Sequence, residues 1–508
     1  MTLLIKNAQF LGGADHKPDE PVRSSLSPHS VAGENMQDIF ISGDTISAIG
    51  DFSDKIADEV IDGRGAYLAS GFIDAHTESD HHLDLLRHPA QKDFLLQGVT
   101  TIVGGYDGVS LAPFSAGSVD LIRAWANPRG VNAHWRTVKE FLNSLNKRKL
   151  GVNFLTFVGY ETLRAAMGIT GVRAMAAKDT KTFSSMLDRA LADGAAGLSV
   201  GSTSFASRRM PYREMKSFAG VLKKYGGIYA ADLGHAPHRE TYGSFEELEK
   251  LHRETGVKIL AGGRAPEEGF VHAVSRKKNF RFTVPLSGIS SMPVLEFLPM
   301  WARKETIEAT YENIRDPWLG PKIMHDLPAV HPDGVIILTV PGHESIEGFS
   351  LHGIMRLYGI PSAKRALMKL MILTKLRARV GVKNADTEYF REAARHSASF
   401  IASENASPRL FGEKELQGAY ASFPKFLSRA QKENISLDSA VRKITAEPAA
   451  FFGLERRGTI QEGNFADLVL FQMSGRETEI RAVIVNGKIA AWEGELVDAK
   501  SGRALKYQ

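Results

Sequence analysis

Ionisable side chains follow several of the short apolar runs in this sequence, and their types point to metal-assisted chemistry. His76 lies at the end of the first such run and Glu78 comes directly after it. Because strand residues two apart lie on one face, both side chains can point the same way, and an imidazole beside a carboxylate can hold a divalent metal ion. Asp107 follows a second run, and Asp232 and Glu404 lie near the ends of two others. If these groups converge, they could bind a metal ion and activate water; alternatively, each one only hydrogen-bonds the backbone of its own loop.

Eight apolar runs, most of them separated by amphipathic stretches, could bring these residues together. Alternating strands and helices in this number are typical of a (β/α)8 barrel, in which catalytic groups gather at the carboxyl ends of the strands. The sequence therefore predicts an α/β fold built on a TIM-like (β/α)8 barrel. The runs are residues 67–77, 99–105, 153–159, 197–201, 227–234, 257–263, 280–287 and 399–405.

Strand-like segments at both ends of the chain predict a separate β domain. Residues 38–50 alternate around Gly43-Asp44, which is typical of a hairpin. Residues 466–492 contain three further runs that indicate a meander. We expect residues 1–65 and 455–508 to meet in one small domain.

The barrel is then expected at residues 66–454, with one insertion. The interval between the seventh and eighth runs is longer than a barrel helix needs, which predicts an inserted subdomain at 292–387. This insertion contains a basic stretch at 362–379 without accompanying aromatic residues. We interpret that stretch as a solvated helix face.

Composition narrows the class of protein. The 508 residues include 43% hydrophobic and 24% charged residues, typical of a globular protein, and no cysteine, which excludes disulfides and thiolate metal sites. The 63 basic residues barely outnumber the 58 acidic ones, so nucleic acid is not an expected partner. No apolar run is long enough for a bilayer and the first residues lack a secretory signal. We expect a cytoplasmic protein with a small-molecule substrate, no membrane partner, and homo-oligomerisation left open.

Several segments resemble the amidohydrolase superfamily, within it the D-aminoacylase (N-acyl-D-amino-acid deacylase) branch. They are SGFIDAHTESD at 70–80, LLQGVTTIVGG at 95–105, GAAGLSVG at 194–201 and the block at 436–471, and the resemblance covers nearly the whole chain. It implies a metal-binding barrel, a β-sandwich built from both termini, and an insertion before the last barrel strand. It also implies hydrolysis of a non-peptide carbon–nitrogen amide bond by metal-activated water.

The metal positions of that branch are substituted here. His76 is unchanged, but Glu78 stands where the branch has a second histidine, Asp107 where it has a cysteine, and Asp232 where it has another histidine. The strand-six histidine falls at Gly262-Gly263, which offers no side-chain ligand. The resemblance therefore implies one divalent ion rather than two. Zinc is the family's metal, whereas the carboxylate-rich set of four predicted ligands suits manganese or magnesium.

Three further residues are candidates for the reaction or for substrate binding. Glu404 stands where the branch has the aspartate that acts as general acid/base, so we expect it to transfer the proton. Tyr160 and Arg264 are candidates for binding a substrate carboxylate. The alternatives are a packed core position for Tyr160 and a surface ion pair for Arg264.

Three functions remain open from the sequence. The first is a metal-dependent amidohydrolase of the N-acyl-D-amino-acid deacylase type. The second is a catalytically inactive homologue that acts as a binding or structural protein. The third is a scaffold that binds acidic surfaces through Lys375, Arg377 and Arg379.

Overall fold

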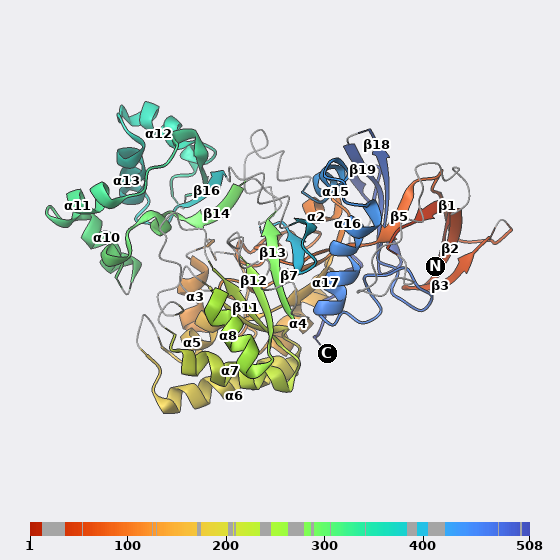
Figure 1. Cartoon of the computed structure of the whole chain (residues 1–508), viewed down its shortest axis with the longest axis horizontal. Helices are drawn as coiled ribbons and strands as arrows, with labels where there is room; N and C mark the ends of the chain where they lie inside the picture. Colours follow the sequence, from red (N-terminus) through yellow and green to blue (C-terminus); the bar gives the residue numbers. More distant parts are fainter. Residues whose placement is uncertain are drawn as a thin grey trace.

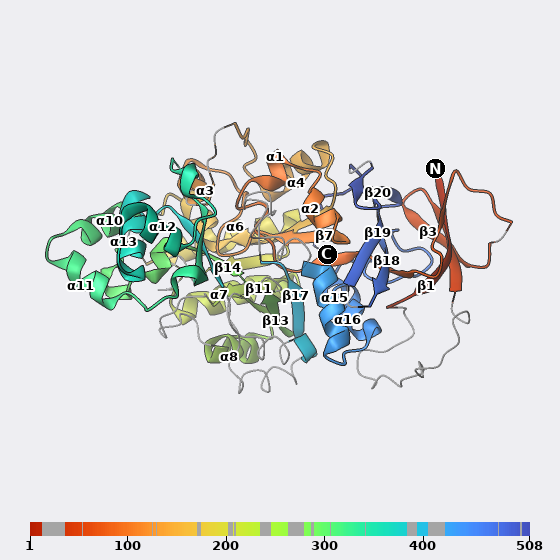
Figure 2. The same ribbon diagram turned by 90° about the horizontal axis from the view of Figure 1, so that it is seen from above.

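The molecule has three parts placed side by side along its long axis. In Figure 1 the helices α10–α13 lie at one end, the sheet containing β1–β3 at the other, and parallel strands between them. Figure 2, seen from above, shows the same order. The computed structural model describes residues 1–507 except 13–35, 53, 124, 127, 129, 170–173, 202–206, 208–209, 234–244, 263–278, 286–288, 305, 341, 384–393, 405–421, 476 and 498–499. Within these residues, no helix combines the length and apolar character needed to cross a membrane.

The central strands run parallel in chain order, and the chain is an α/β protein. These strands form two sheets, and within each sheet every strand pairs with the next central strand along the chain. Only Phe157 separates the last strand of the first sheet from the first strand of the second. The first sheet contains β6 (Phe72–Asp74), β7 (Val99–Gly104) and β8 (Asn153–Thr156). The second contains β9 (Val158–Gly159), β10 (Gly197–Val200), β11 (Ile228–Asp232), β12 (Lys258–Gly262), β13 (Phe280–Pro285) and β17 (Ser399–Ala402). All eight predicted runs contain a strand, so their carboxyl ends share one side.

Amphipathic helices connect these strands. In α6, Phe183, Leu187 and Leu191 recur four residues apart and are buried, which gives the helix one apolar face. The helix ends at Gly194, whose φ of 114° suits a glycine cap. Among the described residues, the helices outside the insertion are α1 (Asp84–Arg87), α2 (Lys92–Leu95), α3 (Ala116–Arg123), α4 (Val138–Lys147), α5 (Tyr160–Ala166), α6 (Ala177–Asp193), α7 (Tyr212–Lys224), α8 (Phe245–Thr255), α15 (Ser422–Lys432), α16 (Leu437–Lys443) and α17 (Ala446–Phe451).

Both ends of the chain contribute to one nine-stranded sheet. Its order is β21-β20-β19-β18-β5-β1-β2-β3, with β4 paired to β1. The run at 67–77, expected as one strand, is divided at Gly71: β5 pairs with β18 and β1, whereas β6 pairs with β7. A Cβ at Gly71 would lie 2.1 Å from Thr100 Oγ1, so only glycine permits this close crossing. The strands are β1 (Thr2–Phe10), β2 (Met36–Ser42), β3 (Thr45–Gly50), β4 (Glu59–Asp62), β5 (Tyr67–Ser70), β18 (Leu468–Ser474), β19 (Glu477–Val485), β20 (Lys488–Trp492) and β21 (Glu495–Leu496).

The insertion has its own sheet and hydrophobic core. Its three antiparallel strands, in the order β14-β16-β15, are β14 (Ile289–Pro293), β15 (Val335–Thr339) and β16 (Arg379–Lys383). Its core includes Val294, Leu367 and Val380. Its helices are α10 (Ile307–Arg315), α11 (Leu319–Asp326), α12 (Leu351–Tyr358) and α13 (Ala363–Leu373), with 3-10 turns η2 (Val294–Phe297), η3 (Met300–Ala302), η4 (Pro332–Gly334) and η5 (Glu344–Ile346).

The expectation of a solvated basic helix across 362–379 is wrong at its end. Helix α13 stops at Leu373, and Arg379 begins β16 with only 1% of its surface exposed. A buried guanidinium needs a partner, because an unpaired charge is costly in the interior.

Candidate active site

Backbone amides donate the hydrogen bonds that join the ends of β6 and β17 around Asp74. The Oδ1 atom of this fully buried aspartate accepts hydrogen bonds from the Ser403 amide at 3.0 Å and the His76 amide at 3.3 Å. The Glu404 amide also donates to the His76 carbonyl at 3.0 Å. Burial raises the pKa of Asp74 to about 7, against the opposing effect of the amides. Asp74 was not among the predicted site residues. Its place at the end of a predicted strand, two residues before His76, is the sequence feature that could have indicated it.

His76 and Glu404 lie close together where the ends of β6 and β17 meet. Glu404 Oε1 is 3.8 Å from His76 Nδ1 and accepts a hydrogen bond of 2.7 Å from Thr283 Oγ1. The Tyr106 ring stacks on the imidazole with a centroid distance of 3.7 Å. Burial lowers the pKa of His76, outweighing Glu404 and the other nearby carboxylates, and so favours the neutral imidazole.

Asp107 and Asp232 form a second pair. Asp107 is buried, and its carboxyl group is hydrogen-bonded to that of Asp232. Burial, followed by the charges of Asp232 and Glu78, raises the pKa of Asp107 well above its usual value. This environment therefore favours the protonated form of the Asp107 carboxyl.

Two of these residues have a strained backbone. The φ angles of Asp107 and Glu404 are +54° and +47°, in the left-handed region that residues other than glycine rarely adopt. Such strain costs about 1 kcal/mol or more and concentrates at functional sites. Both residues lie where parallel strands end, which supports a functional role for this region.

Glu78 is paired with a residue from the insertion. Arg379 Nη2 lies 3.3 Å from both carboxylate oxygens of Glu78. His82 Nε2 lies 3.4 Å from Glu78 Oε2. Burial opposes ionisation of Glu78, but Arg379 and His82 outweigh it and hold the pKa at about 2. Glu78 is therefore an anion whose charge is already compensated.

These pairs do not fit a metal ion. Among the residues that the structure describes, no three His, Asp or Glu side chains are placed to hold one. The four predicted ligands are instead divided: His76 faces Glu404, Asp107 binds Asp232, and Glu78 binds Arg379.

Gly262, at the predicted strand-six metal position, leaves no room for a side chain. A Cβ there would lie 2.8 Å from Thr283 Oγ1 and 3.3 Å from His76 Nδ1. Gly262→Ala is therefore expected to displace Thr283 and to lower the free energy of unfolding by about 1–3 kcal/mol, measured by urea denaturation. Gly220→Ala is the control, because this exposed glycine of α7 has nothing within 4 Å of its Cβ position and should gain about 0.5–1 kcal/mol. Equal stability of the two variants would contradict the crowding at Gly262.

The two predicted substrate-binding residues receive no support from their positions. Tyr160 begins α5 with 1% of its surface exposed, and its ring packs against Phe183 and Phe218 at centroid distances of 5.3 and 6.2 Å. This placement favours the core alternative for Tyr160. Arg264 lies outside the described residues. Both roles stay predictions.

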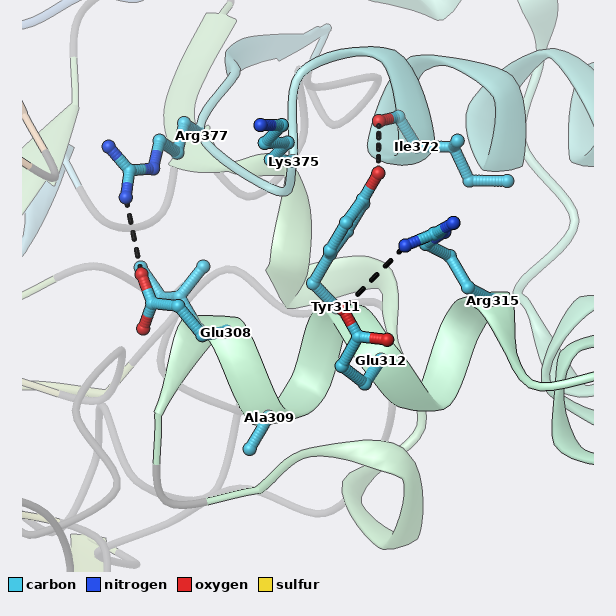
Figure 3. Close-up of a pocket in the computed structure, with 9 residues that line it drawn as sticks. Glu308, Ala309, Tyr311, Glu312, Arg315, Ile372, Lys375 and Arg377 are labelled. Carbon is cyan, nitrogen blue, oxygen red and sulfur yellow. Dashed lines mark hydrogen bonds and ion pairs between the residues drawn. The ribbon is translucent and has the colours of Figure 1, made fainter.

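Three basic residues of the insertion, Arg315, Lys375 and Arg377, line a separate pocket of about 790 Å³ beside α10 (Figure 3). Arg377 Nη2 lies 3.2 Å from Glu308 Oε1, and Arg315 Nη1 lies 3.7 Å from Glu312 Oε1. Lys375 lines the same pocket. Acidic residues thus offset much of this positive charge, which weakens the case for a surface that binds acidic partners.

Comparisons with known proteins find similarity to an amidohydrolase profile and to deacylases of D-amino-acid derivatives. The Amidohydrolase family profile matches residues 354–490. D-aminoacylase from Alcaligenes xylosoxydans xylosoxydans is 27% identical over 494 residues, covering 92% of this chain and 93% of that protein. N-acyl-D-aspartate deacylase from the same organism is 26% identical over 478 residues, covering 91% and 89%. The crystal structure of N-acyl-D-glutamate deacylase from Bordetella bronchiseptica, complexed with zinc and a phosphonate inhibitor, has a TM-score of 0.75 at 20% identity and covers 99% of both chains.

Proposed function

Because this chain belongs to the D-aminoacylase branch of the amidohydrolase superfamily, we propose that it is a hydrolase that cleaves the amide bond of an N-acylated D-amino acid. One observation carries the proposal: the similarity to D-aminoacylase covers 92% of the chain and so includes the strand ends where the buried acids and imidazole lie. The substrate is a small molecule with a non-peptide carbon–nitrogen bond.

The architecture that we propose follows the same relationship. The parallel strands form a (β/α)8 barrel within residues 66–454, in which β8 and β9 together make the third strand, and the sheet built from both termini belongs to a β-sandwich domain. The insertion at 292–387 lies between the seventh and eighth barrel strands. Catalytic groups of such a barrel sit at the carboxyl ends of its strands, where His76 and Glu404 lie.

The proposed reaction uses Glu404 for proton transfer. A water molecule attacks the carbonyl carbon while the Glu404 carboxylate takes its proton, and the carbon–nitrogen bond then breaks as Glu404 gives that proton to the leaving nitrogen. The products are a carboxylic acid and a free amino acid. The hydrogen bond of 2.7 Å from Thr283 to Glu404 Oε1 fixes the carboxylate for this role.

The zinc in the Bordetella deacylase supports a metal cofactor for this family. The sequence of the present chain predicts one divalent ion, zinc by resemblance or manganese or magnesium by its carboxylates. Its donors, however, are paired in a way that does not fit such an ion. No step of the proposed reaction is therefore assigned to a metal.

The test is a substrate panel. The purified full-length chain is incubated with N-acetyl derivatives of acidic, basic and apolar amino acids in both D and L forms, and the released amine is measured. Each assay is run with added Zn²⁺, with added Mn²⁺ and with a chelator. We expect release from D substrates. No release from any substrate under any of these conditions would overturn the proposal.

The second candidate function is a catalytically inactive homologue that binds a ligand. The ion pair between Glu78 and Arg379 favours this function, because the Glu78 carboxylate at a predicted metal position already binds the guanidinium. Such a protein would bind an N-acyl amino acid, detected by calorimetry, and leave it intact.

A further inference from the structure

Arg379 places a permanent positive charge among the acids at the strand ends. Its side chain is buried, and its Nη2 atom contacts both oxygens of Glu78. Its guanidinium carbon lies 3.8 Å above the Trp125 ring, and Nη2 also donates a hydrogen bond of 2.7 Å to Ser291 Oγ in β14. A ring, a hydroxyl and a carboxylate from three segments thus hold the guanidinium in one position. We propose that Arg379 takes the place of a metal ion and is the resident cation of this site.

The charges around Arg379 explain why a cation is needed there. Glu78, Asp107 and Asp232 lie near one another, and unneutralised acids in a low-dielectric interior repel each other. Arg379 interacts electrostatically with both Glu78 and Asp107. An arginine stays protonated even when buried, so it can provide this compensation permanently, as a bound divalent ion would.

The contacts of Glu78 also leave it poorly available to a metal. Both of its oxygens face Arg379 Nη2, and one of them also faces His82. An ion at this carboxylate would have to displace the guanidinium and leave it buried without its partner, which is strongly unfavourable. The strand-six position, Gly262, offers no ligand in compensation. The ion pair at Glu78 and the lack of a side-chain ligand at Gly262 therefore both argue against a bound metal ion.

The guanidinium retains hydrogen-bonding capacity. Its Nε and Nη1 atoms are buried and have no hydrogen-bond partner among the described residues. Buried donors are normally satisfied, and unsatisfied ones mark places where a ligand or water completes the site. These N–H groups can donate to an oxygen of a bound substrate, such as the amide carbonyl on which negative charge develops during attack.

The experiment measures bound metal independently of activity. The full-length chain is equilibrated with excess Zn²⁺ or Mn²⁺, desalted, and analysed for metal by inductively coupled plasma mass spectrometry; affinity for Zn²⁺ alone is measured by calorimetry. We expect far less than one ion per wild-type chain. Arg379→Met frees Glu78 and Asp107 and is expected to bind Zn²⁺ about tenfold more tightly or better. Arg379→Lys keeps a cationic group next to Glu78 and should bind less Zn²⁺ than Arg379→Met.

A matched control exists in the insertion. Arg303 is also buried, and its Nη1 atom pairs with Glu296 Oε2 at 3.2 Å. Arg303→Met should therefore destabilise the chain without raising metal content. The inference is overturned if the wild type holds one ion per chain, or if Arg379→Met binds no more metal than Arg303→Met. The wild-type measurement decides even if Arg379→Met does not fold.

The inference rests on the proposed function, because it assumes that these strand ends are the active site. The two can nevertheless fail separately. A wild-type chain that holds metal and hydrolyses N-acyl amino acids would overturn the role of Arg379 and leave the proposed function standing. A metal-free chain that hydrolyses nothing in the panel would overturn the proposed function and leave the role of Arg379 as the cation of this region standing.

Discussion

Replacing Glu404 with glutamine is expected to lower kcat for amide hydrolysis by about 10²–10⁴-fold, because an amide can neither take the proton of the attacking water nor return it to the leaving nitrogen. Glutamine has the same size, and its carbonyl oxygen can accept the hydrogen bond that Thr283 donates to Glu404 at 2.7 Å. Substrate binding and folding should therefore change little, and KM should stay close to the wild-type value. Steady-state measurement of amine release from the best panel substrate gives both constants.

Two variants show whether the loss is chemical. Glu404→Asp keeps a carboxylate and should recover part of the activity that Glu404→Gln loses. Glu59→Gln makes the same change at an exposed residue of β4 in the terminal sheet and should leave kcat unchanged. If Glu404→Gln retained kcat within about threefold of the wild type, Glu404 would have no part in proton transfer.

The clustering of the acids could be predicted from the sequence because it depends on local patterns. Apolar runs of strand length alternate with amphipathic stretches, and parallel strands in chain order bring their carboxyl ends to one side. The contacts between His76 and Glu404 and between Asp107 and Asp232 follow from that arrangement. No knowledge of side-chain packing was needed to expect these residues near one another.

The cation of the site could not be predicted because it depends on a long-range contact. Glu78 and Arg379 are 301 residues apart in the chain. Helix α13 ends before Arg379, and Lys375 and Leu376 then adopt φ angles of +50° and +63°. Neither residue is a usual left-handed type, so no local signal marks the turn that sends Arg379 inward. Charge pattern alone assigned this arginine to a solvated helix.

The ion pair between Arg379 and Glu78 is expected to contribute strongly to stability. Arg379→Met leaves a carboxylate buried without its counter-charge, and Glu78→Gln leaves a guanidinium in the same state, so each should cost about 3–5 kcal/mol. The double variant removes both charges and should cost clearly less than the two single changes added together. Urea denaturation of the four proteins, at one pH and with metal excluded by a chelator, completes the cycle.

A second combination of variants distinguishes the energetic coupling of Glu78 and Arg379 from a general destabilisation of the insertion. Glu78→Gln combined with Arg303→Met joins two residues that belong to different ion pairs, so their costs should add within about 0.5 kcal/mol. Additive costs for Glu78→Gln and Arg379→Met as well would mean that the buried contact at 3.3 Å has no energetic role. Because Arg379 belongs to β16 and Glu78 follows β6, a large coupling would also mean that the insertion is fastened to the parallel strands at the proposed active site itself.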